Sequence, residues 1–387
     1  MNIEVYNAVG GAAFFQGLLD EWRAAGERVT CRQAVTETAY RSPRGPLGRL
    51  ALRWQMYAGH GWRCWSGARR EADPTDLRVV ATNPFFAPAL VARAGRGRVP
   101  TINLLFDLYP EALVQTGRIG ADSWLARRCA GLTRYALREC AATVFLGERL
   151  RAYTEAAHGP ARRAAVIPVG AEGASFRHTP PIRAEARAPL RMFYSGQLGR
   201  MHDSGTLLAA WEQIGSRRSD LAWVFHASGA GYARLRRQAG EQPGVEWGGA
   251  LPAATWVEEM KRAQVALITV APGAERVVMP SKTYSAMVAG QALLAICPRQ
   301  SDLADLVQRH DCGWVVEPGD VAAFLRVLEH LHVDSAELHE KRCNSYEAGH
   351  RFYDVRPVGA QWLELMHDLR AGKHSPSAIA ERHETAV

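Results

Sequence analysis

The chain has 387 residues, of which 47% are hydrophobic, and its formal net charge is +8. This length and composition can fill two hydrophobic cores and argue against a single domain. The basic charge predicts an anionic partner, which could be nucleic acid, a membrane surface or a phosphorylated ligand. No recognised nucleic-acid-binding motif accompanies the charge, so nucleic acid is the weakest of these alternatives.

Cysteine usage and the N-terminal sequence bear on the cellular compartment. The seven cysteines are scattered and contain no C-x-x-C pair, so we expect neither a disulfide framework nor a metal site. The first residues lack a basic segment followed by an apolar one, and no apolar run approaches the ~20 residues of a membrane span. We therefore expect a cytoplasmic protein.

The first half alternates short apolar runs with segments of helical period, a pattern typical of parallel strands joined by helices. The predicted strands are 3–6, 29–31, 77–81, 100–106, 143–146 and 165–168. The pattern predicts a Rossmann-like domain over residues 1–172. Its first turn contains Gly10 and Gly11, which either let the backbone approach an anionic ligand or only form a tight turn with positive φ.

Residues 41–70 interleave arginines with large apolar side chains. The arginines are Arg44, Arg49, Arg53, Arg63 and Arg69, and the aromatic residues are Trp54, Tyr57, Trp62 and Trp65. This pattern is typical of a segment in the headgroup region of an anionic membrane. It is equally typical of a helix that buries its aromatic side chains and leaves its arginines in water. The first alternative predicts a peripheral protein at the inner membrane face and admits a lipid-linked substrate.

A second α/β half follows a break in the pattern. Residues 173–189 include two consecutive prolines and show no period, which predicts a linker. The strands predicted beyond it are 190–195, 222–226, 245–247, 265–270, 292–296 and 314–317, within a domain of residues 190–355. A helix over 356–370 and a flexible tail over 371–387 complete the chain. Two such halves predict a central cleft at the carboxyl ends of both sets of strands.

Three loops of the second half contain candidate binding residues. Ser195, Gly196, Gly199 and Arg200 lie between a strand and a helix, where glycines make room for a ligand and the arginine can bind phosphate oxygens. The turn at Gly229 either brings backbone close to the ligand or is a plain tight turn.

The third loop contains Lys282, which is predicted in the first turn of a helix capped by Ser281. A lysine there is disfavoured by about 0.3–1 kcal/mol unless an anion binds beside it.

Taken together, these motifs resemble the bacterial glycosyltransferases of family 4 over residues 3–331. The resemblance lies in Gly10-Gly11, FDLYPEALVQTG, YSGQLGRMHDSGTLL and PSKTYSAMVAG. It implies the α/β GT-B fold of two facing Rossmann-like domains, with the final helix packed back on the first. It also implies retaining, metal-independent transfer of a hexose from a nucleoside diphosphate sugar, for which we favour a UDP-sugar, with no other cofactor.

The resemblance implies a role for each candidate residue. Arg200 and Lys282 would neutralise the donor diphosphate, and Glu275 would lie near the donor sugar. Family members commonly carry a second glutamate eight positions later, but Thr283 and Ser285 occupy that region here, which puts ribose recognition in doubt. No D-x-D pair is present, as expected for a metal-independent enzyme.

Asp107 and Glu111 follow a strand of the first half. They either orient the acceptor hydroxyl or cap a helix. The expected acceptor is a saccharide, free or lipid-linked, in cell-surface polysaccharide synthesis. The rival functions are a sugar-nucleotide epimerase, for which only Glu275 and His202 are available, and a non-catalytic partner subunit.

Overall fold

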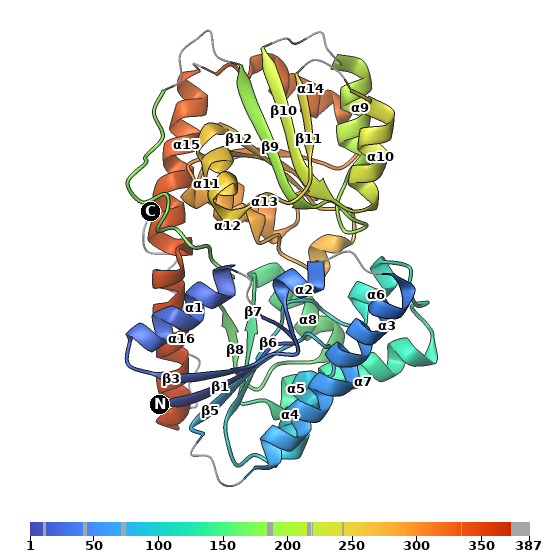
Figure 1. Cartoon of the computed structure of the whole chain (residues 1–387), viewed down its shortest axis with the longest axis vertical. Helices are drawn as coiled ribbons and strands as arrows, with labels where there is room; N and C mark the ends of the chain where they lie inside the picture. The colour runs from blue at the N-terminus through green and yellow to red at the C-terminus, as the bar shows by residue number, and fades with distance from the viewer. Residues whose placement is uncertain are drawn as a thin grey trace. The chain divides into compact units, whose positions relative to one another are not determined.

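The computed structural model describes residues 1–10, 13–41, 45–70, 75–183, 189–214, 218, 220–241, 244–333 and 335–372. The chain divides into two compact units (Figure 1). The first contains Met1–Val169, Arg276–Val278 and Val355–Val387, and the second contains Gly170–Glu275 and Met279–Asp354. The short segment 276–278 has no counterpart in the predicted domain boundaries, and the residues from Gly170 onward group with the second unit.

A six-stranded parallel sheet forms the centre of the first unit, with the order β3-β1-β5-β6-β7-β8. Its strands are β1 (Asn2–Tyr6), β3 (Arg28–Arg32), β5 (Leu77–Ala81), β6 (Thr101–Leu104), β7 (Ala142–Phe145) and β8 (Ala164–Val166). The middle strands β5, β6 and β7 are buried along their whole length because helices cover both faces of a parallel sheet, although they include the polar residues Arg78, Asn103 and Thr143. The short pair β2 (Val9–Gly10) and β4 (Val35–Thr36) was not predicted.

Helices lie on both faces of this sheet (Figure 1). On one face, α1 (Ala13–Ala24) packs on α16 (Val355–Arg370), where the rings of Trp22 and Trp362 are buried with centroids 5.5 Å apart. The other face is covered by α4 (His60–Arg69), α5 (Ala87–Gly95) and α7 (Trp124–Glu139). The remaining helices are α2 (Glu37–Arg41), α3 (Pro46–Trp54), the π-helix η1 (Gln55–Gly59), α6 (Glu111–Gln115) and α8 (Glu148–His158).

The second unit repeats this architecture with the strand order β11-β10-β9-β12-β13-β14. Its strands are β9 (Leu190–Gln197), β10 (Leu221–Ser228), β11 (Val245–Gly248), β12 (Val265–Thr269), β13 (Ala292–Ile296) and β14 (Gly313–Val316). One face is covered by α9 (Gly205–Ile214), α10 (Ala230–Ala239) and α14 (Val321–His330). The other is covered by α11 (Ala253–Arg262), α12 (Lys282–Val288) and α15 (Ala336–Ala348), and α13 (Asp302–Arg309) joins β13 to β14. The predicted α/β class of both halves is confirmed.

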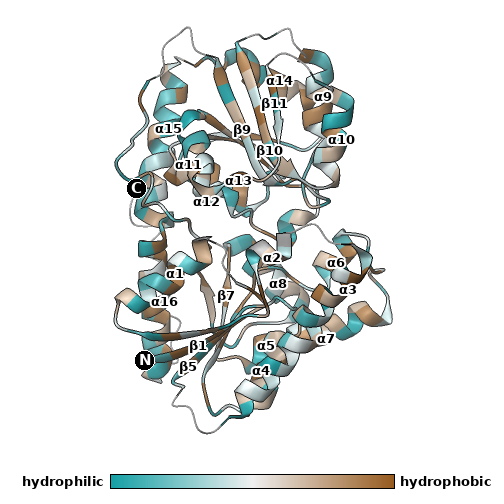
Figure 2. Ribbon diagram, viewed as in Figure 1, coloured by the Kyte–Doolittle hydropathy of each residue, from teal (hydrophilic) through white to brown (hydrophobic). Residues whose placement is uncertain are grey.

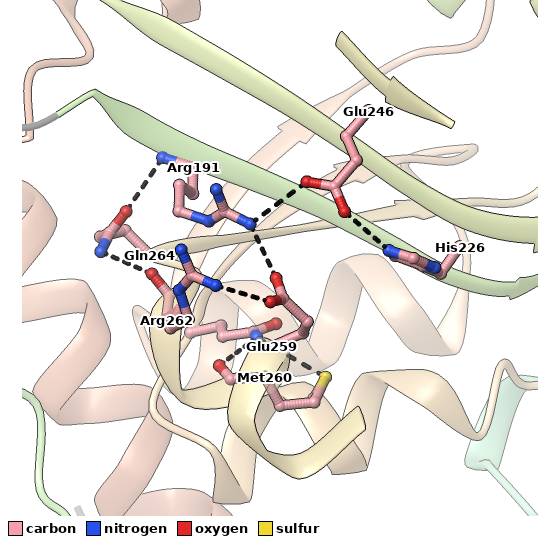
Figure 3. A network of polar contacts seen from close by, with 8 residues as sticks. Arg191, His226, Glu246, Glu259, Met260, Arg262 and Gln264 are labelled. Carbon is pink, nitrogen blue, oxygen red and sulfur yellow. Dashed lines mark hydrogen bonds and ion pairs between the residues drawn. The ribbon is translucent and has the colours of Figure 1, made fainter. Parts of the chain in front are cut away.

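Ion pairs attach α11 to the second sheet (Figure 3). Arg191 on β9 lies 2.7 Å from Glu259 on α11 and 3.7 Å from Glu246 on β11. Glu246 in turn accepts a hydrogen bond from His226 on β10 at 3.1 Å. These contacts assign a structural role to part of the chain's basic charge. Among the residues described, no helix has the length and hydrophobicity that a membrane crossing needs.

All pairings in the two main sheets are parallel, so the carboxyl ends of the strands in each unit lie along one edge. In the second unit this edge carries the loops that follow β9, β10 and β12. Ligands of open α/β sheets bind at such an edge. The candidate residues of each unit are therefore described at its own edge.

Candidate functional site

Lys282 lies at the start of α12, and its ammonium group reaches the loop that follows β9. Nζ donates a hydrogen bond to the carbonyl oxygen of Gln197 at 3.1 Å and lies 3.9 Å from the centroid of the Tyr194 ring. Burial lowers the pKa of Lys282 to about 7. The side chain is half-buried, and an anion placed beside the ammonium would favour its charged form.

His202 lies beside this lysine in the same loop. Its Nδ1 accepts a hydrogen bond from the Gly199 N–H at 3.2 Å. Burial, followed by the charge of Lys282, lowers the pKa of His202 to about 3. The imidazole is therefore neutral at pH 7, and because Nδ1 is an acceptor, its proton lies on Nε2. In the sequence, His202 was a candidate only for the alternative function of an epimerase. Its neutral state depends on burial, which a sequence motif does not reveal.

Backbone hydrogen bonds connect the three loops of this edge. The Leu198 N–H donates to the Ser228 carbonyl at 2.8 Å, and the Leu198 carbonyl accepts from Gly231 N–H at 3.0 Å. The Ala271 N–H donates to the Met201 carbonyl at 2.9 Å, which joins the loop after β12 to the others. Asp203 accepts a hydrogen bond from the Thr206 N–H at 2.8 Å and so caps the start of α9. These bonds fix the backbone around Lys282.

Two glycines allow close contacts between the loops at this edge of the sheet. Gly229 has a φ of +107°, and a Cβ there would lie 2.7 Å from the Leu198 carbonyl oxygen. This glycine is required by contact between loops, which explains its turn without a ligand. Gly196 has a φ of +99°, and a Cβ there would point at Lys282, with Nζ 4.0 Å away. Glycine at this position keeps the space beside the ammonium open.

The other predicted donor residues differ in their surroundings. Arg200 is exposed in the loop with His202, and Glu275 is half-buried in the 3₁₀ turn η3 (Ala274–Arg276) after β12. The Ser195 hydroxyl accepts a hydrogen bond from the Trp256 indole at 3.0 Å. Ser285 is half-buried one turn after Lys282.

Ser281 occupies the N-cap position of α12, but its predicted capping bond is absent in the described structure. Its φ of −60° and ψ of −27° are helical, and the hydroxyl accepts no hydrogen bond from the helix. The reason is geometric, because a capping side chain needs an extended backbone at this position. The hydroxyl is exposed instead.

Gly10 belongs to β2 rather than to an open turn, and it is not among the described residues with positive φ. A Cβ on Gly10 would overlap the Gln33 side chain, with Oε1 1.4 Å away. Gln33 is exposed and can move, so this contact does not by itself require glycine, and the tight-turn prediction is wrong at Gly10 because its φ is not positive. Gly11 lies outside the described residues.

Asp107 and Glu111 lie beyond the carboxyl end of β6 in the first unit. Burial raises the pKa of Asp107 to about 6. Glu111 Oε1 accepts a hydrogen bond from His158 Nε2 at 2.8 Å, which fixes the Glu111 side chain. The N-cap of α6 is Pro110, and the helix has no side-chain capping bond, so the capping alternative is wrong for both residues. The rings of Phe85 and Tyr109 lie beside this loop with their centroids 5.3 Å apart and their planes tilted by 34°.

Comparison with known families identifies the second unit. Residues 190–334 match the family model described as glycosyl transferases group 1. Over 315 residues the chain is 25% identical to a Pseudomonas aeruginosa protein described as probable glycosyltransferase WbjE, with 77% of this chain and 76% of that protein covered.

Solved structures match nearly the whole chain. Sucrose-phosphate synthase from Thermosynechococcus elongatus has a TM-score of 0.71 at 16% identity and covers 96% of this chain and 100% of its own. The Anabaena protein HepE in complex with UDP-glucose has a TM-score of 0.67 at 15% identity, covering 95% and 100%. An E. coli structure with bound UDP-2-fluoro glucose has a TM-score of 0.63 at 12% identity, covering 94% and 98%. These matches confirm the GT-B fold.

Proposed function

We propose that this chain, a glycosyltransferase with the GT-B fold and a glycosyl transferases group 1 domain, transfers a hexose from a UDP-sugar to an acceptor hydroxyl with retention of configuration. The nucleoside diphosphate sugar is a co-substrate, and no metal or further cofactor is invoked. The UDP preference is supported by the matching structures of HepE and of the E. coli protein, which are complexes with UDP-glucose and UDP-2-fluoro glucose. The narrower assignment to family 4 stays a prediction.

The observation that carries this proposal is the environment of Lys282. Its ammonium has a lowered pKa, lies against the Gln197 carbonyl and faces the space that Gly196 leaves open. A diphosphate is the ligand that such a group favours, since a phosphate oxygen beside the ammonium stabilises its charged form.

The residues around Lys282 receive roles in the transfer. As the bond between the sugar and the diphosphate breaks, negative charge develops on the leaving phosphate. Lys282 and Arg200 stabilise that charge. Neutral His202 donates from Nε2 to a donor oxygen, and Glu275 orients the sugar hydroxyls. Gly199 and Ser195 support the loop, and Ser285 takes the ribose position that a glutamate would occupy in relatives.

The acceptor side is assigned to the first unit. Asp107 accepts a hydrogen bond from the acceptor hydroxyl, and Glu111, fixed by His158, supports the same loop. The leaving phosphate takes the hydroxyl proton in a displacement on one face of the sugar. We propose a saccharide acceptor, lipid-linked in the membrane, within the synthesis of a cell-surface glycan.

The proposal is tested by the thermal stability of the wild type and of Lys282→Ala with UDP, GDP, ADP, TDP and their common sugar conjugates. A ligand at one hundred times its Kd adds about 2.7 kcal/mol to the stability of the folded state. We expect uridine compounds to stabilise the wild type and the shift to be lost in the variant. If no nucleotide stabilises the wild type, the non-catalytic alternative replaces the transferase.

A further inference from the structure

The helix α3 exposes large apolar side chains that a helix of a globular domain would normally bury. Leu47, Leu50 and Trp54 are 83%, 66% and 73% exposed, and no residue of α3 is buried. Their spacing of three and four residues places them in one stripe. Leu52 lies on the opposite side and packs toward Met56 and the core of the unit. The exposed stripe is thus an additional apolar face.

The stripe continues beyond α3. The backbone stays helical from α3 through η1 into α4, because the junction residues Gln55 and His60 both have right-handed helical angles. Trp62 on α4 lies eight residues after Trp54, in the same row of the helix, and is 64% exposed. We call Leu47, Leu50, Trp54 and Trp62 the apolar stripe. The helices α3 and α4 that carry these side chains belong to the first unit (Figure 1).

The charge around the apolar stripe has one sign. Residues 38–70 contain no aspartate or glutamate. Arg49 and Arg53 are exposed on α3 next to the stripe, and hydrophobic and hydrophilic residues alternate along this helix (Figure 2). An acid-free amphipathic helix with exposed Trp, Leu and Arg is complementary to anionic lipid, where apolar side chains enter the headgroup boundary and arginines meet phosphate.

We propose that the apolar stripe is a membrane-docking face, which inserts into an anionic bilayer while Arg49 and Arg53 contact lipid phosphates. The alternative in which this segment buries its aromatic residues is wrong for Trp54 and Trp62, which are exposed. The docking face deepens the proposed function, because it brings a lipid-linked acceptor to the enzyme. Its physical basis does not depend on sugar transfer.

The test is co-sedimentation of the full chain with vesicles of phosphatidylglycerol and phosphatidylcholine or of phosphatidylcholine alone, without donor or acceptor. The wild type should bind the anionic vesicles at least tenfold more tightly than the neutral ones. Leu50→Glu combined with Trp54→Glu should reduce anionic binding at least tenfold. Arg53→Gln should weaken it about fivefold, the loss expected for one surface arginine.

A matched control separates insertion from a general effect of surface charge. Ile182 in the second unit is 78% exposed, so Ile182→Glu introduces a glutamate at a similarly exposed apolar position outside the stripe, with one added negative charge against the two of the double variant. It should leave vesicle binding unchanged. Circular dichroism should show that the double variant keeps its fold, since both replaced side chains are exposed. Equal binding of wild type and double variant, or no binding of either, would overturn the proposal.

Light scattering without lipid distinguishes the competing occupant, a second copy of the chain. If the wild type is a dimer, the double variant is a monomer and neither binds vesicles, the apolar stripe is a dimer interface and not a membrane-docking face. The response to UDP-glucose in the thermal assay is measured on the same variants. If the wild type binds UDP-glucose but not vesicles, the docking proposal is wrong and the proposed function stands. If the wild type binds vesicles but does not respond to nucleotides, the proposed function is wrong and the docking proposal stands.

Discussion

The carboxyl edges of the two sheets carry opposite kinds of charge on similar frameworks. In the second unit, Lys282 is a half-buried cation beside the neutral His202, within loops joined by backbone hydrogen bonds. In the first unit, Asp107 is a carboxyl group whose pKa is raised to about 6 by burial, in a loop beside the rings of Phe85 and Tyr109. In the proposed function, the edge of the second unit binds the donor diphosphate and the edge of the first unit binds the acceptor hydroxyl. The comparison teaches that one architecture, used twice, can carry a cation at one edge and a carboxyl group at the other.

The largest expected effect comes from removing the cation of the second unit. Lys282→Ala should lower kcat/KM for the sugar donor about 10²- to 10³-fold, because a group that stabilises the leaving charge is lost. The matched control is Lys261→Ala on α11, where the lysine forms an exposed ion pair with Glu258 at 3.3 Å. Steady-state kinetics of both variants should leave the control near wild type. An equal loss of kcat/KM in both variants would contradict the role of Lys282 in stabilising the leaving group.

Gly229 lies in the loops that backbone hydrogen bonds join at the carboxyl edge of the second sheet, and its replacement should destabilise the fold. Gly229→Ala combines positive φ with a contact of 2.7 Å to Leu198, so unfolding in urea should show a loss of about 3 kcal/mol. Gly240→Ala also has positive φ, but nothing lies within 4 Å of its Cβ position, and about 1 kcal/mol is expected. Similar losses in the two variants would show that the contact between the loops is unimportant.

Asp107 in the first unit should make the free energy of unfolding depend on pH. The pKa of Asp107 is raised from 3.8 to about 6, so ionisation destabilises the fold increasingly between pH 4 and 6 and fully above pH 6. Asp107→Asn should therefore raise stability by about 2 kcal/mol at pH 7.5, and the gain should vanish toward pH 4. Thermal unfolding across this range measures the effect.

Asp107→Asn also tests the division of labour between the units. We expect UDP-glucose binding to be retained while transfer to the acceptor falls. A loss of UDP-glucose affinity in this variant would contradict the assignment of the first unit to the acceptor.

The smallest expected effect compares two serines at N-cap positions, of which only one makes a capping hydrogen bond. Ser281→Ala should change the free energy of unfolding by under about 0.5 kcal/mol, because its hydroxyl makes no capping bond. Ser301→Ala, at the start of α13, removes a bond from the Ala304 N–H at 3.1 Å and should cost about 1 kcal/mol. Chemical denaturation of the two variants provides the comparison, and a larger cost at Ser281 would indicate a capping bond there.

The framework was predictable because short, mostly apolar runs are typical of parallel strands buried on both faces. The runs at Leu77–Ala81 and Ala292–Ile296 were predicted residue for residue. The pairing of β2 with β4 was missed, since two-residue strands have no period to detect. The return of Arg276–Val278 to the first unit was missed for a similar reason, because three residues carry no domain signal.

The site was predictable where a residue conflicts with its local setting. Lys282 stood out as a cation at the start of a helix, and the structure places it against Gln197 and Tyr194. His202 did not stand out, because its neutral state follows from burial and from the neighbouring ammonium. Gly229 was left open between two interpretations, and only the distance to Leu198 explains it.

The most direct test of the account is the affinity for UDP-glucose between pH 6 and 9, measured by calorimetry on wild type and on Lys282→Ala. The pKa of Lys282 is lowered to about 7, so the free protein loses the ammonium above that pH. If the diphosphate binds the charged form, Kd should rise about tenfold per pH unit above pH 7 in wild type. The variant should bind at least tenfold more weakly at pH 6 and show no such rise. Equal affinity and a flat profile in both proteins would contradict the role of Lys282.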